Sequence, residues 1–79
     1  MEFAKTEQEW AEHAAKYLKI ELNRAEISYE DLAERLKPHG FNETKSSIAN
    51  KLSRATMSAH FFLTSLAVIG INSVDLEDI

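Results

Sequence analysis

Strong helix breakers occupy only three positions of the 79-residue sequence, Pro38, Gly40 and Gly70. Elsewhere Ala, Leu, Glu and Lys, which favour helices, are abundant. The sequence therefore predicts an all-α fold in a single domain of four to five helices. Cysteine is absent, so neither a disulfide nor a cysteine-ligated zinc ion supports the domain. A chain this short then depends on close helix packing or on self-association for its stability.

Four capping residues mark where the helices are expected to begin. Thr6, Ser28, Thr44 (or Asn42) and Ser58 each precede a stretch with helical apolar spacing, and such side chains accept a hydrogen bond from a first-turn N–H. The helices are expected over 7–25, from 29 to the stop before Pro38, over 45–54, and from 59 to Gly70. The apolar positions expected in the core are Trp10, Ala11, Ala14, Tyr17, Leu18, Leu22, Ala25, Leu32, Ala33, Leu36, Phe41, Ile48, Leu52, Phe62, Leu63, Leu66, Ala67 and Ile69.

The two ends of the chain differ from its middle. We expect residues 1–6 to be a disordered N-terminal segment, 7–71 to form the domain, and 72–79 to be a tail whose alternating apolar residues allow it to dock. The longest apolar stretch, Ala59–Ile71, is shorter than the roughly 20 residues that cross a bilayer. The first residues also lack the pattern of a secretory signal. A cytoplasmic protein is the expectation.

Charge is unevenly distributed. Between Lys37 and His60 four basic residues face Glu43 alone, a local charge of +3, which leaves −7 for the rest of a chain whose total is −4. A basic segment on an acidic body is typical of a protein with one face for an anionic partner. The alternative is that these four cations are ordinary solvated helix surface.

The order of these features resembles the lambda-repressor-like (Xre-type) helix-turn-helix family. The stretch Ile27–Leu36 (ISYEDLAERL) is similar to the first helix of that motif, and Thr44–Ile48 (TKSSI) is similar to the start of its recognition helix. Ser58–Gly70, followed by the tail, is similar to the closing helix. The resemblance implies a bundle of four to five helices of that type.

Three features depart from the family pattern. The loop Lys37–Glu43 inside the motif is lengthened, Tyr29 stands where the family often has a phosphate-binding Gln, and Glu26 stands where Gly is frequent. From Trp10 onward the chain also resembles, more narrowly, an uncharacterised bacterial family known only as a domain of unknown function. That narrower resemblance implies a fold and a bacterial origin, and no activity.

The resemblance implies that the helix 45–54 contacts DNA. Ile48 would hold this helix against the body, while its opposite face is polar and short enough to approach base edges in a major groove about 12 Å wide. Lysine can bond guanine, asparagine can bond adenine, and serine accepts several bases. The expected base contacts are Lys45, Ser46, Ser47 and Asn50, and the expected phosphate contacts are Tyr29, Lys51, Arg54 and Ser58.

The function expected from this reasoning is sequence-specific binding of double-stranded DNA, as in a bacterial transcriptional regulator. A dimer would place its two 45–54 helices in successive major grooves, about 34 Å apart. Phe61 and Phe62 are adjacent, so both cannot face one core; we expect Phe61 to stay partly exposed and, with the C-terminal tail, to offer a homodimer face. The alternative is that Phe61 packs against Val74 and Leu76.

A second functional hypothesis is a protein-interaction module that has the helix-turn-helix scaffold without DNA binding. The net charge of −4, the long loop and Tyr29 favour it. Neither a metal site nor catalysis is expected, because His13, His39 and His60 lack ligand spacing, no cysteine nucleophile is present, and no plausible Ser-His-Asp order occurs. No cofactor is expected either.

Overall fold

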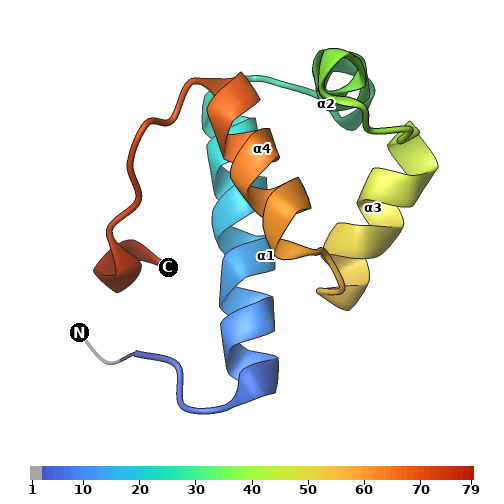
Figure 1. The fold of residues 1–79 in the computed structure, drawn as a ribbon. Coiled ribbons are helices and arrows are strands. Elements are labelled where there is room, and N and C mark those ends of the chain that lie inside the picture. The colour runs from blue at the N-terminus through green and yellow to red at the C-terminus, as the bar shows by residue number, and fades with distance from the viewer. Residues whose placement is uncertain (1–2) are drawn as a thin grey trace.

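The computed structural model describes residues 3–79, which form helices and connecting loops without any strand. The helices α1 and α4 contact each other, α2 packs against both α3 and α4, and α3 also contacts α1. In Figure 1, α2 and α3 lie on one side of the α1–α4 pair, and the C-terminal segment lies on the other. The all-helical prediction is confirmed. The elements are α1 (Glu7–Arg24), α2 (Tyr29–Leu36), η1 (Lys37–His39), α3 (Lys45–Arg54), α4 (Ala59–Ile69) and η2 (Leu76–Asp78).

All four predicted caps are present. In each, the cap hydroxyl accepts a hydrogen bond from the backbone N–H three residues later, at 3.1 Å for Thr6, Ser28, Thr44 and Ser58 alike. These bonds satisfy first-turn donors that have no partner within a helix. Pro38 lies inside η1, directly after α2 ends, so the predicted stop is confirmed as well.

The core lies where all four α-helices meet. Leu18 and Leu22 of α1, Leu32 and Leu36 of α2, and Ile48 and Leu52 of α3 are each at most 2% exposed. Burial of one such side chain contributes about 1.5–3 kcal/mol, so this cluster fixes how α3 sits on the rest of the domain.

The prediction that Trp10 belongs to the core is wrong. Its side chain is 38% exposed, and its ring stacks on Phe3 with the centroids 6.1 Å apart. The reason is length: the 18 residues of α1 span about 27 Å, and the 11 of α4 span about 17 Å. The buried residues of α1 begin at Ala15, so the first turns of α1 project beyond the other helices. Residues 1–2 of the predicted disordered segment lie outside the described residues.

The prediction for α4 is right for Leu66, which is buried, and wrong for Leu63, Ala67 and Phe61. Phe61, Ser65 and Leu66 are buried, Phe62 is half-buried, and Leu63 is 63% exposed. The helix is apolar on nearly every side, so apolar periodicity does not distinguish its buried face. Because Phe61 is only 1% exposed, its ring cannot serve as the predicted homodimer contact.

The C-terminal tail lies against α1 on the side away from α3 (Figure 1). Val74 packs on the core, and Ile79 lines a shallow pocket with Tyr17 and Ile20 of α1. The Asp75 carboxylate accepts a 3.0 Å hydrogen bond from the Glu77 N–H and so caps η2. None of the helices in residues 3–79 combines the length and apolar character needed to span a membrane.

Candidate nucleic-acid interface

Local contacts fix both ends of α3. The Thr44 hydroxyl accepts a bond from the Ser47 N–H at 3.1 Å, and the Ser47 hydroxyl oxygen accepts one from the Thr44 N–H at 2.8 Å. This reciprocal pair is a capping box with serine at the third helical position. At the other end Ala55 adopts φ of 55°, a left-handed conformation that ends the helix. The start of the helix is therefore defined by its own side chains, whereas its end requires alanine in a conformation that residues with a Cβ disfavour.

Burial divides the surface of α3 into two halves. Ile48 and Leu52 point into the core, and on the opposite side Ser46, Asn50, Ser53 and Arg54 are exposed. Their spacing of four, seven and eight residues from Ser46 places them on one helical face. We call these four residues the exposed face of α3. Sequence reasoning missed Ser53, although its seven-residue spacing from Ser46 identifies it as a neighbour on that face.

The four expected base-contact residues do not all lie on this face. Ser46 and Asn50 do, whereas Lys45, with 68% of its side chain exposed, lies on the flank of the helix toward Glu30 of α2. Ser47 is half-buried on the other flank of the helix, where its hydroxyl donates to the Glu43 carboxylate at 2.6 Å. Its polar atom is thus already engaged by the chain.

The expected phosphate contacts are spread over three elements. Arg54 is exposed, and among the described residues its guanidinium has no carboxylate partner. Ser58 is exposed but caps α4, and Tyr29 is half-buried against the core at the start of α2. Lys51 forms an ion pair with Glu43, and its Nζ lies 4.8 Å from the centroid of the Phe61 ring.

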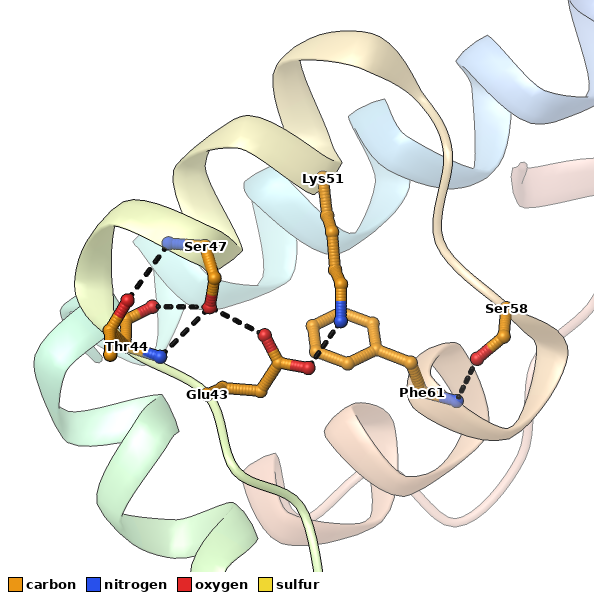
Figure 2. Close-up of polar contacts among 6 residues, drawn as sticks. All are labelled: Glu43, Thr44, Ser47, Lys51, Ser58 and Phe61. Atoms are coloured by element: carbon orange, nitrogen blue, oxygen red, sulfur yellow. Dashed lines mark hydrogen bonds and ion pairs between the residues drawn. The ribbon is translucent and has the colours of Figure 1, made fainter.

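Glu43 is the residue whose role sequence reasoning did not anticipate. Figure 2 shows its carboxylate between the Ser47 hydroxyl and the Lys51 ammonium, beside the ring of Phe61. Only 8% of the Glu43 side chain is exposed. Burial acts to raise the pKa of Glu43, but hydrogen bonds from Lys51 and Ser47 and the charge of Lys51 together hold that pKa below its ordinary value. Glu43 therefore stays ionised at neutral pH.

A groove between α2 and the start of α3 carries an acidic lining. Lys37 pairs with Glu34 at 3.2 Å, and Lys45 lies 3.9 Å from Glu30. With Lys51 bound to Glu43, the basic segment seen in the sequence does not form one continuous basic face. The groove is lined by Glu30, Asp31, Ala33, Glu34, Lys37, Glu43, Thr44 and Lys45.

Within residues 3–79 no cluster of three metal-ligating side chains occurs.

A family model described as a domain of unknown function (DUF6471) matches residues 10–74, which is most of the chain. No curated protein and no solved structure matches the chain significantly. The match covers α1 from Trp10 onward, α2 to α4, and the tail as far as Val74, and it assigns no ligand or partner to the exposed face of α3.

Proposed function

We propose that this chain, which belongs to the DUF6471 family of domains of unknown function, binds double-stranded DNA through the exposed face of α3. The observation that carries the proposal is that this face consists of three short polar side chains and one arginine without a carboxylate partner in the described chain. An α-helix with short polar side chains fits the major groove, where serine and asparagine can bond base edges.

The arrangement of α2 and α3 supports a helix-turn-helix of the lambda-repressor-like type. Ala33 of α2 is 7% exposed and lines the groove shared with the start of α3, so a small residue lies where the two helices approach. α3 is fixed by Ile48 and Leu52, which leaves its polar half free to enter a groove. A role in transcription regulation follows from this proposal.

Base reading would fall to Ser46, Asn50 and Ser53 and phosphate binding to Arg54, while Lys45 lies on the flank toward Glu30 of α2. Because this face carries so few cations, the affinity for DNA is expected to depend only weakly on salt concentration. Each neutralised phosphate adds about 0.9 to the slope of log affinity against log salt concentration. A single domain would then bind weakly, and two copies on a two-fold site would double the slope.

The test is selection of DNA ligands from a random pool, followed by affinity measurements on the enriched sequence. Asn50→Ala is expected to lose discrimination at one base pair, on the order of 10- to 100-fold. Asn23→Ala, which changes an exposed asparagine at the end of α1, is the matched control and is expected to behave like the wild type. No enrichment from the pool would contradict base reading.

The acidic groove between α2 and α3 favours a second candidate function, binding of a basic protein segment. Four carboxylates line it, and each faces one cation of the chain: Lys45, Arg35, Lys37 or Lys51. A lysine- or arginine-rich peptide would bind by replacing the more exposed of these cations at their carboxylates. Failure to bind any DNA at about 50 mM salt, where phosphate attraction is strong, together with titration of groove resonances by a basic peptide, would favour this function.

A further inference from the structure

We propose that Ser47 and Lys51 form an anion-binding site that the chain fills with its own Glu43 carboxylate, and that Glu43 thereby limits how many DNA phosphates α3 contacts. The inference rests on the proposed function for the identity of the competing anion, a backbone phosphate. The site itself consists of the contacts around Glu43.

The Glu43 carboxylate is bound as a phosphate oxygen pair would be. One oxygen, Oε1, accepts from the Ser47 hydroxyl at 2.6 Å, and the other, Oε2, accepts from the Lys51 ammonium. A hydroxyl and an ammonium are among the donors that proteins use for phosphate oxygens in nucleic-acid contacts. The capping box of Thr44 holds Ser47 in place, so one donor of the site is preorganised.

Of the two donors, Ser47 is half-buried and Lys51 reaches the surface, while the Glu43 acceptor is buried. Lys51 keeps 36% of its side chain exposed, whereas Glu43 keeps 8%. The ammonium rests on the Phe61 ring, which holds it close to α4 and near the carboxylate (Figure 2). An external anion would reach Lys51 from solvent but would have to displace a carboxylate that is tethered one residue before the cap of the same helix.

The consequence for DNA binding is a change in the balance between specific and sequence-independent contacts. Phosphate contacts supply most sequence-independent affinity, and base contacts supply discrimination. By neutralising Lys51, Glu43 removes one phosphate contact and leaves Arg54 as the phosphate contact of α3, beside the side chains proposed to face bases. Glu43 is therefore a specificity-determining residue, although it touches no base.

The experiment measures the salt slope of DNA binding for the wild type, Glu43→Gln, Lys51→Met and the double variant. Glu43→Gln is expected to steepen the slope by about 0.9, so that between 50 and 200 mM salt its affinity falls about 3.5-fold more than that of the wild type. The double variant is expected to return to the wild-type slope, because the freed ammonium is gone. Lys51→Met alone is expected to leave the slope unchanged, since Lys51 is already neutralised. An unchanged slope in Glu43→Gln, or a shallower one in Lys51→Met, would overturn the proposal.

A second readout separates failure of this site from failure of DNA binding. Inorganic phosphate is titrated into ¹⁵N-labelled wild type and Glu43→Gln, whose thermal unfolding first establishes that the variant folds. Saturable shifts of the Ser47 and Lys51 amides in the variant, absent from the wild type, support the anion site even if no DNA binds. Identical responses in the two proteins would refute it. If Glu43→Gln does not fold, the Lys51→Met slope decides.

Discussion

The structure predicts that Phe61 contributes far more to stability than its neighbour Phe62. Phe61 is 1% exposed, meets the Phe41 ring edge-on at 6.2 Å, and lies beneath the Lys51 ammonium. Phe62 is half-buried, with its ring 6.5 Å from that of Tyr17. Exchanging each phenylalanine for leucine keeps an apolar side chain and removes the ring contacts.

The magnitude follows from those contacts. The edge-on pair with Phe41 contributes about 0.5–1.5 kcal/mol, and the cation–π contact with Lys51 contributes about 0.5–1 kcal/mol. Phe61→Leu should therefore lower the free energy of unfolding by about 1–2.5 kcal/mol. Phe62→Leu should cost less than about 1 kcal/mol because its ring is partly in solvent. Alanine is a poorer choice, because a loss of about 3–5 kcal/mol approaches the total stability of about 4–12 kcal/mol expected for 79 residues.

The assay is urea unfolding followed by far-ultraviolet circular dichroism, which reports on all helices. Fluorescence is less suitable, because Trp10 is 38% exposed and reports on the first turns of α1. The slope of free energy against urea should be the same in both variants, since the fold is kept. Equal losses in the two variants, or a larger loss for Phe62→Leu, would refute the assignment of the buried face of α4.

Three further predictions concern stability. Ser65→Ala should raise the free energy of unfolding by about 1 kcal/mol, because the buried Ser65 hydroxyl has no hydrogen-bond partner among the described residues. A lower free energy of unfolding in a urea titration would show that the hydroxyl is bonded. Glu26→Gly should raise the free energy of unfolding by up to about 1 kcal/mol, since Glu26 is exposed with φ of 57°. The same change at Glu12, which is exposed within a helix, should lower it. Differential scanning calorimetry measures both variants. The pKa of Glu43 is lowered in the fold, so the stability that ionised Glu43 contributes is present above its ordinary pKa of 4.5 and is lost as pH falls through the folded value. The free energy of unfolding, measured between about pH 6 and pH 2, should therefore fall less in Glu43→Gln than in the wild type.

Helix boundaries could be predicted because they depend on local chemistry. A serine or threonine at a cap bonds a backbone N–H three residues away, and Pro38 ends α2 by lacking an N–H. Thr44 and Ser58 therefore identified the starts of α3 and α4 without any knowledge of the packing. The anchoring of α3 by Ile48 was also predictable, since few of its other residues are apolar.

The packing of α4 and the exposure of Trp10 could not be predicted in the same way. Both depend on which helices reach a given position in space, and the sequence pattern of one helix carries no such information. α4 is apolar on several sides, so the neighbours of Phe61 decide its burial. Ser65 is a polar residue on the buried face, so it also interrupts the apolar periodicity that would identify that face.

The ion pair between Lys51 and Glu43 could be predicted only in part from the sequence. Glu43 precedes Ser47 by four residues, but the intervening cap at Thr44 breaks helical spacing, so no helical pairing rule applies across it. The contact exists because the loop before Thr44 places the Glu43 carboxylate beside α3, and the Phe61 ring packs against the Lys51 ammonium. Charge counting alone therefore overstated how basic the surface of α3 is.

The central claim, that the exposed face of α3 contacts DNA, is tested most directly by the salt slope of DNA binding in two matched arginine variants. Arg54 and Arg24 each lie in the last turn of a helix and are exposed, but only Arg54 belongs to α3. Arg54→Ala is expected to weaken binding to every sequence and to lower the slope by about 0.9, whereas Arg24→Ala, with the same change in net charge, should leave the slope at the wild-type value. Equal slopes for the wild type and Arg54→Ala would contradict the claim.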